Sequence, residues 1–448
     1  MSRPHESEVA IIGAGISGAL LAAILGRRGI AVTLYERRAD LRVAGSAGGR
    51  SINLALAERG LAAAERIGMR EALLAAALPM HGRMIHDASV DGGQSFRPYS
   101  ADGRQAINAI SRGRLGELLL DAAAATDGVT IVFEHRLQNV DLTSGTLTFE
   151  VGPNRERQTA RADIVLGADG AYSAVRQSVL PSTGFTYSQE YLDYGYKELV
   201  IPDRDGEYAL DPGALHIWPR GESMMIALPN RDRSFTCTLF WPRQQFEDLS
   251  TDERVRSHFR SYYPDAVDLM PTLIEDFSTN PIGALVTVRS WPWVHRGTGC
   301  TVALIGDAAH AVVPFYGQGA NASMEDCAVL DDCLARSDGD WDRALDAYQN
   351  SRKANADAIA DMALDNHAEM SDKVNSPVFR AATAGQHVLE RLLGNVYRSK
   401  YELVSFTTIP YAEVVARVRR QNRAVAVVAA ALGLAGAYSW RRLRRRSQ

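Results

Sequence analysis

The sequence predicts an α/β fold in which two separated stretches form one domain with parallel strands, an antiparallel β-sheet is inserted between them, and the C-terminal region is helical. Short apolar runs followed by glycine-containing turns and helix-like sequence are typical of buried parallel strands, and they occur at residues 9–12, 164–166 and 301–305. Residues 185–245 contain runs of β-forming residues separated by turns, which indicates the antiparallel sheet. Helical spacing at residues 340–370 and 377–394 indicates the C-terminal helices.

The first apolar run begins a dinucleotide-binding fingerprint. It leads into Gly13-Ala-Gly15-Ile-Ser-Gly18, an Ala/Leu-rich helix, and a second apolar run that ends in Glu36-Arg37. In such a strand–helix–strand unit the glycines allow a tight turn and a close approach of the pyrophosphate, and the acid binds the ribose hydroxyls. The unit is therefore predicted to be Rossmann-like. An acid at position 36 favours FAD or NAD over a nucleotide with a 2′-phosphate.

The third apolar run is followed by features that suit the other end of a flavin. Asp307 ends the strand and is placed to bind a ribityl hydroxyl, while a Pro- and Gly-bearing loop leads to a helix that starts near Gly319 and Asn321. A helix N-terminus stabilises negative charge such as that on a reduced flavin. The alternative is an ordinary strand–helix junction with Asp307 as a cap. The apolar run at residues 164–166 is followed by Gly167-Ala-Asp169-Gly170, in which Asp169 is a further candidate contact of the cofactor.

These three motifs, in this order, resemble those of the FAD-dependent aromatic hydroxylases, a flavoprotein monooxygenase family. Within that family the chain is similar to the kynurenine 3-monooxygenases over residues 9 to 411, in the segments Arg50–Gly60, Gly195–Leu199, Leu215–Pro219, Ala227–Asn230, Phe235–Phe240, Pro314–Gly319 and Met362–Asn366. The resemblance implies hydroxylation of L-kynurenine to 3-hydroxykynurenine through a flavin C4a-hydroperoxide. NADPH would be a transient reductant and O2 a substrate, in tryptophan catabolism and NAD biosynthesis.

The resemblance also implies roles for single residues. Arg83, Tyr99, Asn366 and Tyr401 are expected at the amino-acid end of the substrate, where a guanidinium fork matches a carboxylate. Phe315 and Tyr316 are expected at the flavin edge, although Tyr316 stands where the family motif more often has His. Further cofactor contacts are expected from Arg50, Asn53 and Arg112. An apolar lining is expected from Ile107, Leu215, Ile217, Ile226, Leu228, Phe240, Phe315 and Met370.

The predicted domains follow from these assignments. Residues 1–180 form the first half of the FAD-binding domain, with strands of the substrate sheet near 82–99, and residues 181–284 form the substrate domain. The second half of the FAD-binding domain covers 285–370, and a C-terminal helical region covers 371–448. Locally, we expect helices at 54–78, 110–120 and 252–277, and a β-meander from 129 to 166 that ends in a parallel strand.

Composition narrows the class of protein. A chain of 448 residues that is 46% hydrophobic can bury a large core, and a net charge of −4 gives no reason to expect nucleic acid. The four cysteines have neither the spacing of a metal site nor that of a disulfide framework, so a reducing cytoplasmic compartment and no metal are predicted.

The C-terminal tail differs from the rest of the chain. Residues 414–448 hold nine Arg and no acid, so residues 1–413 carry −13. Residues 424–440 are uncharged with arginines on both sides, and the tail 424–446 is predicted to contact a membrane. As a helix the uncharged stretch would be about 25 Å long, short of a bilayer core of about 30 Å. A helix packed on the catalytic domain is the alternative.

Three other functions fit parts of the sequence. Hydroxylation of another aromatic substrate needs the same motifs. Flavin enzymes that saturate isoprenoid chains share the fingerprint and the Gly-Asp motif but need no carboxylate-binding Arg. A membrane-tethered flavoprotein redox sensor would bind FAD without turnover, and substrate-stimulated NADPH oxidation distinguishes it from an enzyme.

Overall fold

The computed structural model describes residues 7–44, 52–87, 93–100, 103–368 and 398–425. Arg50, Met370, the expected helix at 377–394 and the tail from residue 426 lie outside these residues.

A six-stranded sheet forms the centre of the predicted dinucleotide domain. Its order is β18 (Val294–Arg296), β19 (Thr301–Leu304), β12 (Ile164–Gly167), β1 (Val9–Ile12), β2 (Val32–Tyr35) and β8 (Val129–Val132). All neighbours pair in parallel except β18, which runs antiparallel to β19. The apolar runs are buried on both faces, as Ile11, Val165 and Val302 show with exposures of 0%.

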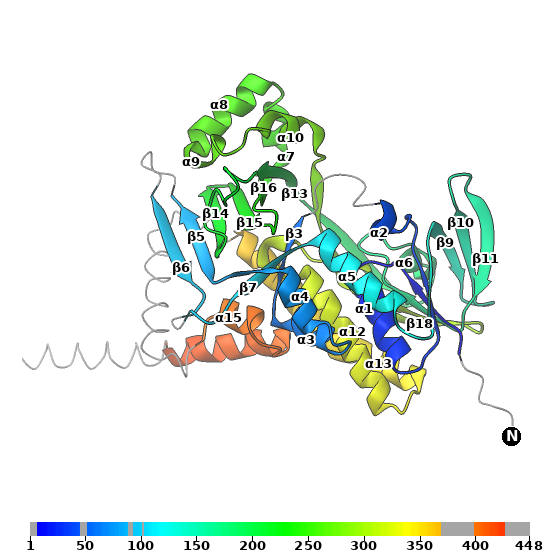
Figure 1. The fold of residues 1–448 in the computed structure, drawn as a ribbon. Helices are drawn as coiled ribbons and strands as arrows, with labels where there is room; N and C mark the ends of the chain where they lie inside the picture. Colours follow the sequence, from blue (N-terminus) through cyan, green and yellow to red (C-terminus); the bar gives the residue numbers. More distant parts are fainter. Residues whose placement is uncertain (1–6, 45–51, 88–92, 101–102, 369–397, 426–448) are drawn as a thin grey trace, which may run out of the picture.

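Helices cover this sheet and continue into the C-terminal half (Figure 1). The helices are α1 (Ile16–Arg27), α2 (Leu41–Ala44), α5 (Arg112–Ala124), α6 (Ala174–Val179), α11 (Asp307–His310), η1 (Pro314–Tyr316), α12 (Gly319–Arg336) and α13 (Trp341–Ala368). Hydroxyl side chains cap two of them, because Ser111 accepts a hydrogen bond from the Arg114 amide and Ser173 accepts one from the Arg176 amide.

Two small sheets flank the central one. β9 (His135–Asp141), β10 (Thr146–Val151) and β11 (Glu156–Arg161) form an antiparallel meander at the edge of the molecule (Figure 1). β7 (Ile107–Ser111) lies between β3 (Asn53–Leu56) and β4 (Leu78–Met80), with α3 (Glu58–Glu65) and α4 (Arg70–Ala76) in the connection between β3 and β4.

Three local expectations were wrong in part. The two ends of the expected helix at 54–78 belong to strands β3 and β4, because both strands pair with β7, which lies at least 27 residues further along the chain. Ile110 also belongs to β7, and α5 begins only after Ser111. Residues 129–132 lie at the edge of the parallel sheet and not in the meander. In each case a distant partner strand determined the structure.

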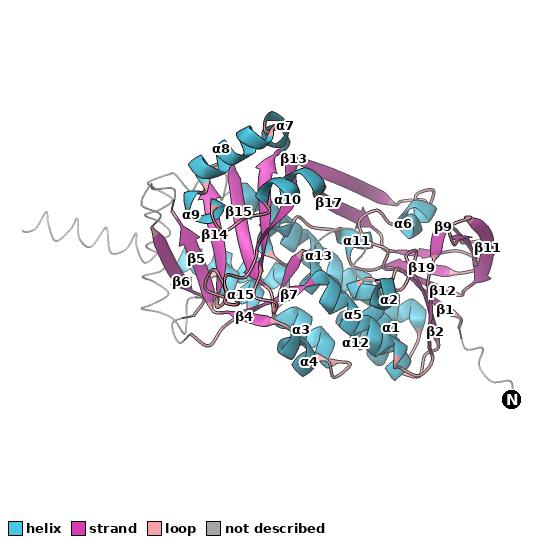
Figure 2. Ribbon diagram, turned by 45° about the horizontal axis from the view of Figure 1, so that its top comes forward, coloured by secondary structure: helices cyan, strands magenta, loops and turns pink. Residues whose placement is uncertain are grey.

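The inserted sheet has seven strands. Its order is β17 (Gly283–Trp291), β13 (Thr186–Ile201), β16 (Phe235–Pro242), β15 (Ser223–Pro229), β14 (Ala214–Arg220), β5 (Gly82–His86) and β6 (Gln94–Pro98). One side is covered by α7 (Arg243–Asp248), α8 (Asp252–Tyr262), α9 (Pro264–Val267) and α10 (Leu273–Thr279), as Figure 2 shows. We call this side the helix face and the opposite side the site face.

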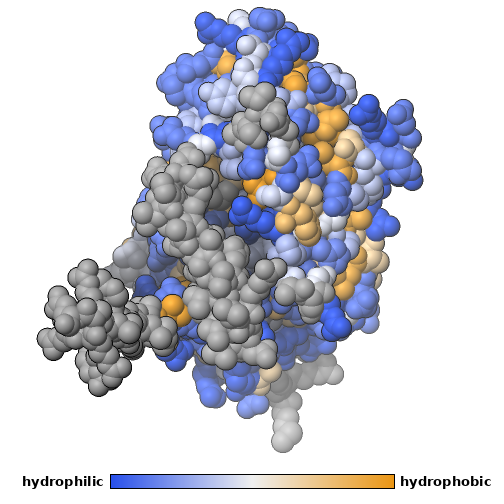
Figure 3. Space-filling model, turned by 90° about the vertical axis from the view of Figure 1, so that its left-hand side faces the viewer, coloured by the Kyte–Doolittle hydropathy of each residue, from blue (hydrophilic) through white to orange (hydrophobic). Residues whose placement is uncertain are grey.

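The described C-terminal segment packs beside the site face. It consists of α15 (Lys400–Ser405) and a helix over residues 411–425. Its buried residues Leu403, Val404 and Tyr411 belong to the same hydrophobic cluster as Ile217 and Phe240 of the inserted sheet. Figure 3 looks onto this side of the molecule, where a mainly hydrophilic surface is interrupted by groups of hydrophobic side chains.

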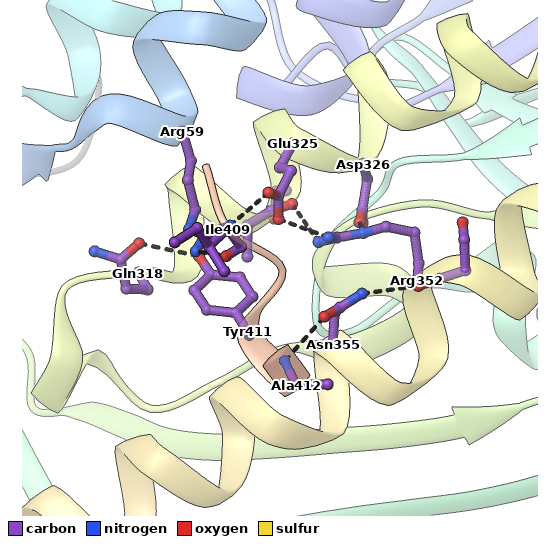
Figure 4. A network of polar contacts seen from close by, with 12 residues as sticks. Arg59, Gln318, Glu325, Asp326, Arg352, Asn355, Ile409, Tyr411 and Ala412 are labelled. Atoms are coloured by element: carbon purple, nitrogen blue, oxygen red, sulfur yellow. Dashed lines mark hydrogen bonds and ion pairs between the residues drawn. The ribbon is translucent and has the colours of Figure 1, made fainter. Parts of the chain in front are cut away.

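A largely buried polar network connects this segment to α3, α12 and α13 (Figure 4). Arg59 of α3 forms an ion pair with Glu325 at 2.7 Å and donates to the carbonyl of Ile409, and its guanidinium lies 3.8 Å from the Tyr411 ring centroid. Arg352 of α13 pairs with Glu325 and with Asp326, both at 2.6 Å. Buried charges are costly unless they are paired, and these pairs fix the segment to α12 and α13.

Candidate active site

The glycine turn between β1 and α1 has the shape of a pyrophosphate site. A Cβ atom on Gly18 would overlap the carbonyl oxygen of Gly13, so only glycine permits this packing of helix on turn. A Cβ on Gly15, in contrast, would meet no atom within 4 Å, and no side chain caps the start of α1. The helix N-terminus therefore faces open space that an anion can occupy.

Glu36 lies at the end of β2, next to this turn. Its Oε2 accepts a hydrogen bond from the Ala14 amide at 2.9 Å, and its Oε1 accepts one from the Arg38 amide at 3.0 Å. Each oxygen keeps a second lone pair for a ribose hydroxyl. Arg37, beside it, is exposed.

The second predicted flavin contact lies where β19, α11 and α12 meet. Asp307 accepts a long hydrogen bond from Ser323 Oγ at 3.3 Å, and the start of α12 has no side-chain cap. A Cβ on Gly319 would meet no atom closer than 3.7 Å. Both ends of a dinucleotide site thus show uncapped helix N-termini, and these residues fit FAD.

Two other predicted contacts, Asp169 and Asn321, are bonded to other parts of the protein. The carboxylate of Asp169 accepts hydrogen bonds from Ser173 Oγ and from the amides of Ala174 and Val175, so it caps α6, and burial raises its pKa. The side chain of Asn321 bonds to the backbone of Ala55, Ala57 and Gly317, which joins α12 to β3. Arg50 lies outside the described residues.

Asn53 and Arg112 stand where the two domains meet. Asn53 Nδ2 donates to Asn230 Oδ1 at 2.8 Å, whereas its buried Oδ1 has no hydrogen-bond partner among the described residues. Arg112 is exposed at the start of α5. Burial raises the pKa of the nearby Glu198 to about 7, and the charge of Arg112 limits this rise. Glu198 lies in one of the motifs of the resemblance, but that motif gave it no role.

Arg83, on β5, has no anionic partner among the residues that the structure describes. Its guanidinium carbon lies 4.0 Å from the centroid of the Tyr401 ring and 5.7 Å from that of Tyr99. Arg83 Nε and the Tyr99 hydroxyl are buried atoms without a hydrogen-bond partner in the described ranges, where no Asp or Glu forms an ion pair with Arg83 either. Burial raises the pKa of Tyr99 well above its usual value, so this phenol stays neutral. A half-buried guanidinium in such surroundings favours an anionic ligand.

The other predicted substrate residues gather around the same point. Tyr401 stacks on Tyr99 with centroids 5.5 Å apart and lies 5.9 Å from the ring of Tyr316. Asn366 Nδ2 donates to the carbonyl of Phe315 at 2.6 Å, which links α13 to η1. The structure therefore brings together Arg83, Tyr99, Tyr316 and Tyr401, with Asn366 and Phe315 joined to them through η1.

The site face of the inserted sheet leads away from Arg83 along a mostly apolar row. Cross-strand pairing places one row of side chains side by side, namely Ile85, Ile217, Ile226, Thr238 and Glu198. With about 4.8 Å between strands, this row is about 19 Å long. Of the predicted lining, Leu215, Ile217, Ile226 and Phe240 pack around this face, and Ile107 and Leu228 belong to the adjacent cluster with Tyr99. A cation thus stands at one end of an apolar surface.

Comparison with known proteins identifies the family. The model of an FAD binding domain family matches residues 6–363. A kynurenine 3-monooxygenase of Myxococcus xanthus is 45% identical over 415 residues, which cover 92% of this chain and 88% of the relative. A kynurenine 3-monooxygenase of Sus scrofa is 38% identical, with 94% and 88% covered.

The chain belongs to the kynurenine 3-monooxygenase family. Among solved structures, the tetrameric form of 2-methyl-3-hydroxypyridine-5-carboxylic acid oxygenase is similar with a TM-score of 0.66 at 23% identity, covering 84% of this chain and 95% of that one. PqsL of Pseudomonas aeruginosa in complex with 2-aminobenzoylacetate has a TM-score of 0.66 at 20% identity, with 82% and 97% covered. These likenesses bear on the fold, and they confirm the predicted FAD-binding α/β architecture with an inserted sheet and C-terminal helices.

Two further observations concern this member of the kynurenine 3-monooxygenase family. Within the described ranges, no group of three or more His, Cys, Asp or Glu side chains could hold a metal ion. None of the helices described is both long enough and apolar enough to span a lipid bilayer. The predicted membrane contact, which begins at residue 424, lies almost wholly outside the described residues.

Proposed function

We propose that this protein hydroxylates L-kynurenine to 3-hydroxykynurenine with NADPH and O2. The observation that carries the proposal is the guanidinium of Arg83, which stands at the end of an apolar face and has no acidic partner in the part of the chain that the structure describes. Kynurenine has a carboxylate at one end and an aromatic amine at the other, so it matches a cation followed by an apolar surface. The similarity to kynurenine 3-monooxygenases over more than nine-tenths of the chain supports the same substrate.

FAD is proposed to bind along the two uncapped helix N-termini. Gly13, Gly15 and Gly18 would hold the pyrophosphate and Glu36 the ribose, while Asp307 and Gly319 would hold the ribityl chain and the ring. Bound FAD would accept a hydride from NADPH and activate O2. Residues 1–180 and 285–370 would then be the two halves of the FAD-binding domain, and residues 181–284 the substrate domain.

The residues of the chain would orient the substrate and exclude water. Arg83 would hold the carboxylate, with Tyr99 and Asn366 as neutral hydrogen-bonding neighbours. The apolar row would direct the aromatic ring of the substrate toward η1, where the rings of Phe315 and of Phe240 on β16 have centroids 5.3 Å apart. Removing water from this region protects a reactive oxygen species from wasteful decay.

The experiment that tests this function is anaerobic stopped-flow reduction of the flavin by NADPH, with and without L-kynurenine, followed by identification of the product. Faster reduction with L-kynurenine and the formation of 3-hydroxykynurenine are expected. Unstimulated reduction with no hydroxylated product would refute the proposal. Stimulation by another aromatic compound, with hydroxylation of that compound, would reassign the substrate and keep the reaction class.

The proposed location is the cytoplasm, with the C-terminal tail in contact with a membrane. The support is the sequence of residues 424–440, which is uncharged and has arginines on both sides. Flotation of the protein with vesicles that contain anionic lipids should be lost when residues 426–448 are removed. Equal flotation of both forms would refute the membrane contact and would leave the hydroxylase assignment unaffected.

A further inference from the structure

A chain of buried polar side chains lies on the helix face, directly behind the substrate site. His86 Nδ1 is 2.6 Å from Asp265 Oδ2, and His86 Nε2 is 2.9 Å from His216 Nδ1. His216 Nε2 is 2.9 Å from the carbonyl oxygen of Asp211. His86 and His216 are each only 1% exposed, and the proposed reaction gives them no role.

The hydrogen bonds determine where the protons are. A carbonyl oxygen can only accept, so His216 must carry a proton on Nε2. Burial lowers the pKa of His216 to about 4, so its ring is neutral and its Nδ1 accepts a hydrogen bond. His86 must therefore donate through Nε2. The Nδ1 atom of His86 then faces a carboxylate at 2.6 Å, which requires a proton between them. Trp218 Nε1 donates to both oxygens of Asp265 at 3.0 Å and stabilises the anion. The arrangement fits an imidazolium at His86 paired with a carboxylate at Asp265.

This ion pair holds the strand that carries Arg83. Side chains alternate along a strand, so Arg83 points to the site face and His86 to the helix face. β5 is attached to the sheet through parallel pairing with β14, and beyond it lies only β6, whose residues are mostly exposed. His86 joins β5 to α9 through Asp265 and to β14 through His216, and its ring stacks on Trp218 at 3.9 Å. The helix-face contacts of His86 thus fix the register and tilt of β5.

We propose that His86, with Asp265, is a positioning residue that holds Arg83 in place for the substrate carboxylate. The inference rests on the proposed function, because it takes the anion at Arg83 to be that of L-kynurenine. The charged and titratable groups that face His86 are Asp265 of α9 and His216 of β14. Arg220 of β14 also donates to the carbonyl of His86 at 2.9 Å.

The variants Asp265→Asn and His86→Gln test this role. Asp265→Asn keeps an acceptor for Trp218 but removes the anion that the imidazolium needs. His86→Gln cannot bridge both partners. In each, the KM for L-kynurenine should rise about tenfold or more, while kcat at saturation, FAD content and NADPH oxidation without substrate stay within twofold of wild type.

His258→Gln is the matched control. His258 also lies behind the sheet, on α8, but its ring bonds to Gln245 and stacks on Tyr262, without contact to β5. The KM of His258→Gln for L-kynurenine should stay within twofold of the wild-type value. An unchanged KM in Asp265→Asn, or an equal rise in His258→Gln, would overturn the positioning role.

A measurement on the unaltered protein guards against variants that do not fold. Nitrogen-15 NMR of labelled histidine in the FAD-loaded enzyme at neutral pH should show one ring protonated on both nitrogens, and this signal should be missing in His86→Gln. A neutral ring at His86 would overturn the inference. This measurement needs no turnover, so a wild type that does not hydroxylate kynurenine would refute the proposed function and leave the NMR result on His86 interpretable.

Discussion

Replacing Arg83 by Met removes the guanidinium and keeps a side chain of similar length. In the structure, the Arg83 cation rests on Tyr401 and Tyr99 and has no carboxylate partner among the described residues. Substrate binding would therefore create a new charge pair rather than exchange one for another. Truncating one partner of a buried, hydrogen-bonded charge pair costs about 2–5 kcal/mol, because the other charge is left desolvated and unpaired.

A loss of about 3 kcal/mol corresponds to roughly a hundredfold, since each 1.4 kcal/mol is a factor of ten. Steady-state hydroxylation should therefore show a KM for L-kynurenine about a hundredfold higher in Arg83→Met. Stimulation of flavin reduction by the substrate should also be lost at concentrations that saturate wild type. Arg83→Lys should recover little, because an ammonium cannot form the two parallel hydrogen bonds of a guanidinium.

FAD content is the internal control for this series. Arg83 lies on β5 of the inserted sheet and belongs to none of the three flavin motifs, so both variants should bind FAD as wild type does. Hydroxylation by Arg83→Met at the wild-type kcat/KM would refute the carboxylate role. Loss of FAD from the variant would instead mean that the damage reaches the cofactor site.

Three further predictions follow from other contacts. Glu36→Arg should weaken FAD binding at least tenfold in a fluorescence titration, because it removes a ribose acceptor and the Ala14 amide contact; unchanged affinity would exclude Glu36 from the site. Tyr411→Phe should lower the unfolding free energy by about 1–3 kcal/mol, measured by denaturant titration, because Gln318 Oε1, 3.0 Å away, loses its donor in a buried position. Burial raises the pKa of Asp326, but His310 and Arg352 outweigh burial and lower it to about 2, from an ordinary 3.8. Its stabilisation, about 2 kcal/mol, is therefore present above pH 4 and lost as the pH falls toward 2, so Asp326→Asn should be less stable at pH 7 and less sensitive to acid below pH 4.

The parts of the fold that the sequence predicts best are those with a local cause. The turn at residues 13–18 has a local cause, because the close packing of Gly18 on Gly13 leaves no room for a Cβ atom. The preceding strand β1 is apolar throughout. Ser111 is a local signal that the prediction missed: a hydroxyl residue before Arg112 marks the start of α5, whereas the helix was expected from residue 110. What failed locally was β3, whose partner β7 lies more than 50 residues away, so that its short apolar sequence fits a helix equally well.

The candidate site was predictable only through resemblance, for a physical reason. Arg83, Asn366 and Tyr401 come from a strand, a helix and the C-terminal segment, and no local pattern indicates that these three meet. The ion pair of His86 and Asp265 was not predicted, because nothing in the sequence indicates that a histidine and an aspartate 179 residues apart lie together. Alternation on β5 could have placed His86 opposite Arg83, and so pointed to the helix face.

Under the proposed function, the C-terminal segment is part of the candidate active site rather than an accessory. Tyr401 supplies one of the two rings beneath Arg83, while Tyr411 donates to Gln318, the residue directly before the helix that faces the proposed flavin ring. Arg59 joins the segment to α12 through Glu325 and the Ile409 carbonyl, and the Arg59 side chain is buried. Because buried ion pairs become strongly destabilising when one partner is lost, the segment cannot leave without disturbing the helix on which the flavin would rest. The substrate end and the flavin end of the site are therefore coupled through residues 399–412, whatever the tail beyond residue 425 binds.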